Sequence, residues 1–402
     1  MEFKRNMKEY KSRIDAKISA EAGFFADMAV EIARNPELGN QEFKASALLA
    51  KSLTSRGWNV EFPYMELATA FNARTQPSSE AAAPVVAFMA EYDALPDIGH
   101  ACGHNLSGVM SLLAGIALAE AVKDELPGEI RVVGTPAEET NGAKVEMADK
   151  GVFDDVDFAM LVHASTGLAK PIYRSLALKP LQFTFKGFSS HAASAPWDGL
   201  NALNGLQLFF HSLDMLRQHV RPETRIHGVV TKGGEAANIV PDLAQGNFYF
   251  RSPSRIYLET LLEKIYNCAR GAALATGTEV SWLHYETGFH EVLPNLEAEA
   301  RMMEVLDELE ISYLREPYWA GSTDVGNVSW KCPTMHLNLA IVEKEIAMHT
   351  REFAAIAGDR KYIEPGIVNG AKAMARMGLM VLAEPNIRKN MKEALEKAKQ
   401  FS

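Results

Sequence analysis

The chain has 402 residues, of which 47% are hydrophobic and 23% charged, and its formal net charge is −10 at pH 7. This composition is typical of a soluble globular protein with one large or two ordinary domains. The negative charge argues against a nucleic-acid or anionic-membrane partner. Three cysteines exclude a disulfide framework, and their odd number favours a reducing compartment.

Neither the N-terminal segment of the chain nor its longest apolar run predicts a membrane location. The N-terminal residues, Met1 to Glu9, are charged and contain no signal-peptide core. The longest apolar run, about Val109 to Val122, is too short to span a bilayer and contains Glu120. We therefore expect a cytoplasmic protein.

The first part of the chain alternates between helical and strand-like segments. We expect helices at 18–34, 41–56, 105–122 and 142–150, and strands that begin at Trp58, Val85, Glu129 and Asp157. A turn at 78–84, rich in Ser, Ala and Pro, precedes the strand at Val85. Such alternation of strands and helices predicts a mostly parallel sheet.

The pattern changes near Leu178, where the strands begin to alternate as half-exposed strands do. We expect strands at 181–186, 225–231, 245–251 and 279–284, and helices at 201–218 and 258–276. This β-α-β-β-α-β order fits a ferredoxin-like insert. After about Thr287 the first domain resumes, with a helix at 295–309, a strand at 334–341 and two closing helices.

A candidate metal loop follows the strand that begins at Val85. Cys102 and His104 are two residues apart, and Gly103 between them gives the backbone freedom to aim both side chains inward. A thiolate and an imidazole suit zinc or a similar divalent ion. Taken alone, the pair is equally compatible with a buried free cysteine beside a hydrogen-bonded histidine.

Further polar residues with metal-binding chemistry come later in the chain. Glu138 and Glu139 follow one apolar strand, His163 ends another, and His349 lies near the C-terminus. Ends of strands that carry such side chains suit a site at the carboxyl edge of an open α/β sheet. Adjacent carboxylates repel each other, so a nearby cation explains them economically. The alternative is a solvated turn with two exposed acids.

These motifs, in this order, resemble the dinuclear-metal aminoacylase and carboxypeptidase family. More narrowly, they resemble the amidohydrolase branch that contains aminobenzoyl-glutamate hydrolase, hippurate hydrolase and Xaa-basic dipeptidase. The motifs are Asp93-Ala-Leu-Pro, His100-Ala-Cys-Gly-His104, the Glu138–Glu139 pair, and His163, which is 24 positions after Glu139. The branch usually has Asp after Cys-Gly-His. Asn105 in this place is similar to the aminobenzoyl-glutamate hydrolase and Xaa-basic dipeptidase subgroup.

The resemblance implies a metal centre with one or two divalent ions per chain, zinc or manganese. It implies that the ligands are Cys102, His104, Glu139, His163 and His349, and that Glu138 is the general base that activates water. His336 competes with His349 for the last ligand position, but its place within a strand favours a core or substrate-pocket histidine. Asp93 and His100 are expected to orient the ligands.

The resemblance also assigns roles to three residues of the insert. His191, on a loop rich in Ser and Ala, would donate to the oxyanion, either in its own chain or across a dimer. Asn238 and Arg251 would contact the carboxylate of the substrate. The structural alternatives for the three residues are a capped loop, a turn asparagine and a surface ion pair.

The expected fold is therefore α/β, with a metallopeptidase-like catalytic domain at 1–177 and 287–402 around a mostly parallel sheet. A ferredoxin-like α+β lid and dimerisation domain at 178–286 is inserted in it. The expected activity is metal-dependent hydrolysis of an N-acyl amino acid or a small dipeptide-like amide with a free carboxylate, by a homodimer. Two alternatives are a deacylase of another amide on the same scaffold and a non-catalytic binding protein that kept the fold.

Overall fold

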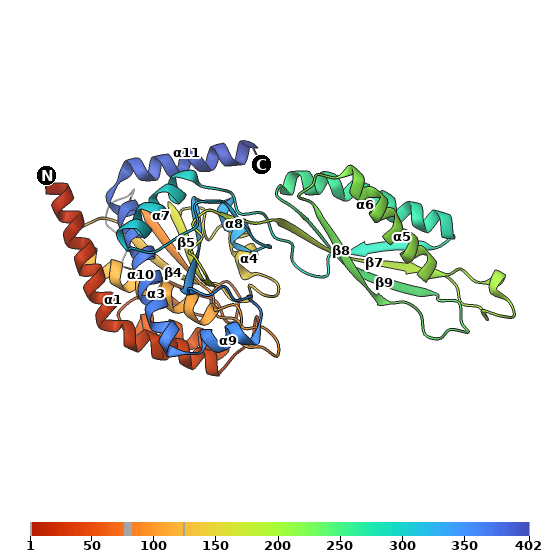
Figure 1. Cartoon of the computed structure of the whole chain (residues 1–402), viewed down its shortest axis with the longest axis horizontal. Coiled ribbons are helices and arrows are strands. Elements are labelled where there is room, and N and C mark those ends of the chain that lie inside the picture. The colour runs from red at the N-terminus through yellow and green to blue at the C-terminus, as the bar shows by residue number, and fades with distance from the viewer. Residues whose placement is uncertain (1, 76–82, 124, 402) are drawn as a thin grey trace. The chain divides into compact units, whose positions relative to one another are not determined.

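The computed structural model describes residues 2–75, 83–123 and 125–401, which form two compact units (Figure 1). The first unit comprises the chain up to Arg174 and from Val292 onward, and the inserted unit comprises Ser175–Glu291. These boundaries lie a few residues outside the predicted insert at 178–286. Most of the turn expected at 78–84 falls outside the described residues.

A six-stranded, mostly parallel sheet forms the centre of the first unit, as predicted. Its strands are β1 (Asn59–Glu61), β2 (Phe71–Arg74), β3 (Val85–Ala90), β4 (Glu129–Gly134), β5 (Phe158–Thr166) and β12 (Thr334–Val342). The strand order is β1-β2-β4-β3-β5-β12. The strands β4, β3, β5 and β12 run parallel, and β2 runs antiparallel to both of its neighbours. A separate parallel pair joins β6 (Tyr173–Arg174) to β11 (Tyr318–Trp319).

Both faces of this sheet are covered, which explains why its central strand is a continuous apolar run. Val86 and Phe88 of β3 belong to one hydrophobic cluster, and Ala87 and Met89 belong to another. Successive side chains of a strand point to opposite faces, so an uninterrupted apolar sequence predicts burial on both sides.

Nine helices of the described residues belong to the first unit. They are α1 (Glu2–Arg34), α2 (Phe43–Thr54), α3 (His104–Val122), α4 (Ala143–Asp149), α7 (Leu296–Glu308), α8 (Val325–Ser329), α9 (Arg351–Ala357), α10 (Arg360–Ala383) and α11 (Pro385–Phe401). The helices α1, α3 and α10 pack against one another (Figure 1). Three helices follow β12 rather than the two expected.

The helix α1 begins well before residue 18, the expected start. Its buried side chains include Tyr10, Ile14 and Ile18. This spacing of four continues the apolar stripe toward the N-terminus, which places one face of the longer helix against the core.

The helix α3 is the apolar centre of the first unit. Among the described residues, it alone is long and apolar enough to cross a membrane, with 19 residues and a mean hydropathy of 1.5. It begins at His104, before the apolar run that the sequence showed, and so reaches this length. However, 89% of the apolar segment is buried inside the protein. That burial is typical of the core helix of a folded domain.

The inserted unit has the β-α-β-β-α-β order that the sequence predicts. Its elements are β7 (Ala177–Lys186), α5 (Ala202–Leu216), β8 (Arg225–Lys232), β9 (Leu243–Ser252), α6 (Arg255–Thr276) and β10 (Glu279–Leu283), with short 3₁₀ helices at Pro196–Asp198 and Arg217–His219. The antiparallel sheet has the order β10-β7-β9-β8, with β8 at one edge. Alternate residues of β7, such as Phe183 and Phe185, are buried in the core of this unit.

Candidate metal centre

Six predicted site residues of the first unit converge in the structure. Their donor atoms form three overlapping groups, within each of which all atoms lie within 4.8 Å of one another. The groups are Cys102, His104 and His163; Cys102, Glu139 and His349; and His104, Glu138 and Glu139. Cys102 and the two glutamates follow the carboxyl ends of β3 and β4, where open α/β sheets bind ligands.

Hydrogen bonds orient two of the histidines toward the centre of this cluster. Nδ1 of His104 lies 2.8 Å from Oδ1 of Asp93, and Nδ1 of His163 lies 2.8 Å from the carbonyl oxygen of Ala164. Because these oxygen atoms only accept, each Nδ1 carries a proton, which leaves Nε2 of each ring as the atom available to a metal ion. Nε2 of His163 lies 3.2 Å from Sγ of Cys102. This is the orientation that metal-binding histidines adopt.

Several atoms of the cluster have no hydrogen-bond partner among the described residues. Nε2 of His104 and Oε1 of Glu139 are both buried and form no hydrogen bond. Nε2 of His349 lies 3.4 Å from Sγ of Cys102 and 3.5 Å from Oε1 of Glu139. Buried polar atoms without partners are costly, and a bound cation would satisfy them. Sulfur, nitrogen and oxygen donors together fit a divalent metal ion.

The electrostatics of the cluster also favour a positive charge. Burial works against protonation of His104, yet the negative charges of Cys102, Asp93 and Glu91 hold its pKa well above the usual value. Burial raises the pKa of the Cys102 thiol well above its usual value. The pKa of Glu138 is also raised, mainly by burial and to a lesser extent by the negative charge of Glu139. A metal ion would stabilise the thiolate and the carboxylates together.

The backbone has unusual conformations where it delivers two of these side chains. Gly103 has φ +80°, and a Cβ atom there would lie 2.8 Å from Cβ of Ala164. Only glycine therefore fits between Cys102 and His104 without strain, as the sequence predicted. His349 has φ +60°, and its N–H donates to the carbonyl of Ala101 at 2.9 Å. This bond joins the segment before α9 to the loop that carries Cys102.

Of the two residues expected to orient the ligands, Asp93 makes direct contacts with them. Its Oδ1 accepts from His104, and its Oδ2 accepts from the backbone N–H of Glu139 at 2.9 Å. One carboxylate thereby connects two of the predicted ligands. His100 is buried but belongs to none of the three donor groups in the described chain. Burial and the nearby charge of His104 lower the pKa of His100 to about 3.

A fully buried ion triad next to the cluster was not predicted from the sequence. Nζ of Lys144 lies 2.7 Å from Oε1 of Glu91 and 2.8 Å from Oδ1 of Asp324. The second oxygen of Glu91 lies 3.5 Å from Nε2 of His104. Burial alone would raise the pKa of Glu91, but the charges of Lys144 and His104 outweigh it and lower the pKa to about 2. The one available signal was Glu91 itself, an acid at the end of an apolar strand.

The structure separates the roles of the two histidines that competed for the last ligand position. His349 is grouped with Cys102 and Glu139, whereas His336 belongs to none of the three groups in the described chain. The buried ring of His336 stacks on Tyr173, with ring centres 4.1 Å apart. Burial lowers the pKa of His336 to about 3, so it is a neutral side chain. Its expected contact with substrate stays a prediction.

The three predicted residues of the inserted unit lie on its loops and sheet. Nδ1 of His191 accepts the backbone N–H groups of Ala193 and Ser194, both at 3.2 Å. The proton of the exposed ring is therefore on Nε2. Asn238 is exposed, and its loop adjoins the loop of His191. The backbone carbonyl of Asn238 accepts the N–H of Ala192 at 3.0 Å. Arg251 of β9 is half-buried, and its guanidinium lies over the ring of Tyr249.

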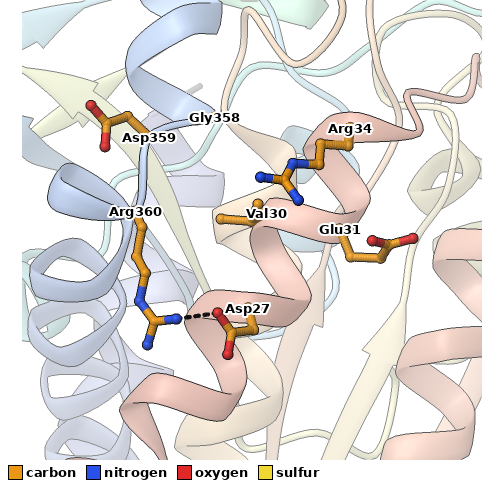
Figure 2. A pocket seen from close by; sticks show the side chains of 7 residues that line it. All are labelled: Asp27, Val30, Glu31, Arg34, Gly358, Asp359 and Arg360. Carbon is orange, nitrogen blue, oxygen red and sulfur yellow. Dashed lines mark hydrogen bonds and ion pairs between the residues drawn. The ribbon is translucent and has the colours of Figure 1, made fainter.

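A surface cavity of about 720 Å³ lies apart from all of these residues. Figure 2 shows its lining, which comes from α1 and from residues 358–360, at the start of α10. The lining residues are Asp27, Val30, Glu31, Arg34, Gly358, Asp359 and Arg360. Arg360 forms an ion pair with Asp27 across it. The lining includes none of the predicted site residues.

An α/β fold with clustered sulfur, imidazole and carboxylate donors at the carboxyl edge of its sheet defines a candidate metallohydrolase. Residues 87–378 match the profile of peptidase family M20/M25/M40, and the chain belongs to this family. This result confirms the family that the motifs predicted. The protein is accordingly a hydrolase that acts on amide or peptide bonds.

Two curated relatives and one solved structure resemble the whole chain. The chain is 34% identical over 379 residues to Xaa-Arg dipeptidase from Mus musculus, which covers 90% of this chain and 87% of that protein. It is 27% identical over 444 residues to a p-aminobenzoyl-glutamate hydrolase chain from Escherichia coli, covering 92% of this chain and 91% of that protein. The fold matches an aminohydrolase structure from methicillin-resistant Staphylococcus aureus with TM-score 0.78 and 19% identity, over 92% of this chain and 100% of that chain.

Proposed function

We propose that the protein hydrolyses the amide bond of a small dipeptide-like or N-acyl amino acid substrate with one or two divalent ions, zinc or manganese. The ions would be held by Cys102, His104, Glu139, His163 and His349. The convergence of these donor atoms, some of them buried without a hydrogen bond, is the observation that carries the proposal. A divalent ion bound there supplies Lewis-acid polarisation of the scissile carbonyl and lowers the pKa of water.

Glu138 is the residue that we assign to proton transfer. It lies beside Glu139 in the third donor group, next to the predicted ligands. Its raised pKa suits a carboxylate that accepts a proton from the attacking water and then donates it to the leaving amine. Asp93 keeps the neighbouring ligands in place, because it binds both His104 and the N–H of Glu139.

Substrates with a basic C-terminal residue are the first class to test. The similarity to Xaa-Arg dipeptidase supports this choice. The net charge of −10 would also attract cationic substrates. Arg251 and Asn238 would hold the free carboxylate of such a substrate, since a guanidinium can bind a carboxylate with two parallel hydrogen bonds. A product with a carboxylate that inhibits the wild type but not Arg251→Ala would support this assignment over a deacylase of another amide.

The inserted unit is proposed to provide the dimer contact and the oxyanion donor. Its edge strand β8 exposes Val229 at 63% and Val230 at 49%. Edge strands with exposed apolar residues favour pairing, and a symmetric homodimer would protect them. His191 supplies an exposed Nε2–H for the oxyanion.

Elemental analysis of the gently purified protein and a panel of amide substrates test the function. We expect bound zinc or manganese, loss of activity with a chelator, and recovery when either ion is added back. Cys102→Ala and His163→Ala should bind less metal than the wild type. A fully active metal-free protein would contradict the metal centre, and inactivity of the metal-loaded protein on every amide would favour the binding-protein alternative.

A further inference from the structure

Two buried carboxylates hold the turn that carries Glu138 and Glu139. Oε1 of Glu42 accepts the backbone N–H of Ala137 at 2.8 Å. Oδ2 of Asp93 accepts the backbone N–H of Glu139 at 2.9 Å. The residue between these two amides is Glu138, so both of its flanking N–H groups are fixed by side chains from elsewhere in the chain.

The side chain of Glu42 does not cap the helix that follows it. It stands at the N-terminus of α2, yet its side chain caps no amide of that helix. Glu37 instead accepts the N–H groups of Lys44 and Ala45 in the first turn. The carboxylate of Glu42 reaches across to Ala137 and, with its second oxygen, accepts from Oγ1 of Thr69 at 2.8 Å.

The burial of Glu42 is costly for the fold alone. Its exposure is 0%, and no ion pair of the described residues includes it. Burying a carboxylate without a cationic partner disfavours its charged form, which raises the pKa of Glu42 to about 7. An apolar residue at the same place would avoid this cost. The buried carboxylate therefore points to a purpose beyond packing.

The turn that carries Glu138 has an unfavourable backbone conformation, which contacts from other segments must stabilise. Ala137 is buried and has φ +64°, a left-handed conformation that residues with a side chain rarely adopt. Gly39 approaches it from the same segment as Glu42. A Cβ atom at Gly39 would lie 2.3 Å from Oγ1 of Thr140 and 3.0 Å from Cα of Ala137. The segment 37–42 thus holds the turn by a hydrogen bond and by close packing.

We propose that Glu42 is a positioning residue for Glu138. By holding the N–H of Ala137, it keeps the turn in its left-handed conformation and so sets the direction of the Glu138 side chain. A misplaced general base loses rate steeply, because proton transfer requires hydrogen-bond geometry. The inference rests on the proposed role of Glu138. The side-chain hydrogen bonds of Glu42 go to Ala137 and Thr69 and not to a donor atom of the three metal groups. Asp93 holds the N–H of Glu139 independently, so the expected effect is on kcat rather than on metal content.

Steady-state kinetics, elemental analysis and thermal unfolding of Glu42→Ala and Glu42→Gln test this inference. We expect kcat of Glu42→Ala to fall roughly 10–100-fold, the scale typical of outer-shell residues that support a metal site. The KM and the metal content should stay at wild-type values. Glu42→Gln keeps one acceptor oxygen and should lose less. Glu42→Asp, which keeps the carboxylate on a shorter side chain, should recover part of the activity lost in Glu42→Ala.

Glu291 of the inserted unit offers a matched control. It is also a buried carboxylate, 3% exposed, and it accepts the backbone N–H of Arg255 at 3.0 Å. Glu291→Gln should leave kcat unchanged. If it lowers kcat as much as Glu42→Gln does, the effect of Glu42 is only structural and the inference is wrong.

Two milder variants keep the test decisive if Glu42→Ala does not fold. Thr69→Val removes one hydrogen bond from Glu42. Gly39→Ala introduces a methyl group that would clash with Thr140 and Ala137 of the turn. A fall in kcat at wild-type metal content in either variant supports the inference, and wild-type kcat in both overturns it. A folded Glu42→Ala with wild-type kcat also overturns it. Glu138→Gln, measured in parallel, separates the two claims, since an active Glu138→Gln would instead refute the general base itself.

Discussion

The two units of the molecule present their predicted site residues in opposite ways. In the first unit, Cys102, His104 and Glu139 lie in a largely buried cluster, and neighbouring side chains or backbone groups hold them. In the inserted unit, His191 and Asn238 are exposed on adjoining loops. The cluster of the first unit is therefore preorganised, whereas the positions of His191 and Asn238 depend on their loops.

The largest effect should come from the turn of the first unit. Glu138→Gln should keep its metal and lose kcat by roughly 10²–10⁴-fold, the scale of a lost general base. Glu139→Gln should instead weaken metal binding, because its carboxylate oxygen lies among the donor atoms. Elemental analysis and kcat, measured on both variants, check this difference. Loss of metal from both variants alike would show that the two roles are wrongly assigned.

The buried triad tests how far the first unit depends on fixed charges. Lys144→Met leaves Glu91 and Asp324 buried without their cation, so the unfolding free energy should fall by about 3–5 kcal/mol. Denaturant unfolding measures this loss. Lys150→Met, on the exposed end of the same helical segment, is the control and should leave stability unchanged. The double variant Lys144→Met with Asp324→Asn should lose less than Lys144→Met alone, and an equal loss would argue against charge as the cause.

For the inserted unit, His191→Ala gives the corresponding test of an exposed donor. Removal of one oxyanion donor should lower kcat by roughly 10²–10³-fold while metal content and fold stay intact. Wild-type kcat in this variant would remove the loop from the mechanism.

Mixed dimers would show which chain delivers His191. Inactive Glu138→Gln and inactive His191→Ala chains would be refolded together, and the mixed species would be verified by native mass spectrometry. Recovered activity means that the histidine acts across the dimer. Mixed dimers without activity mean that each chain uses its own His191.

The smallest effect should come from Glu291, a buried carboxylate of the inserted unit whose pKa is strongly raised by burial. Burial raises the pKa of Glu291 to about 7, above its usual value of 4.5. A raised folded-state pKa means that Glu291 favours folding at low pH and that this contribution is lost as pH rises to about 7. Glu291→Gln should therefore gain stability relative to the wild type as pH rises between these values, by at most about 3 kcal/mol. Urea midpoints at pH 4.5 and pH 8 measure it, and a pH-independent difference would contradict it.

Asn105 shows how one departure from the usual motif is explained only by the fold. The sequence has Asn at a position where the branch usually has Asp, but it does not explain this difference. In the structure its Nδ2 donates to the carbonyl oxygens of Ala29 at 3.1 Å and Ala357 at 2.8 Å. An ionised Asp cannot donate, so this place requires the amide. The residue thus joins α1 to the end of α9 beside the candidate metal loop.

The sequence by itself determined the alternation of strands and helices, the ferredoxin-like insert and the identity of the candidate donor residues. These features depend on local periodicity and on motifs of a few neighbouring residues. The start of α1, the contact between Glu42 and Ala137, and the triad around Lys144 were decided only by the tertiary structure. Lys144 and Asp324 are 180 residues apart, and a buried charge has no local pattern that distinguishes it from an exposed one. Only packing around the sheet determines which charges lose their water and must find each other.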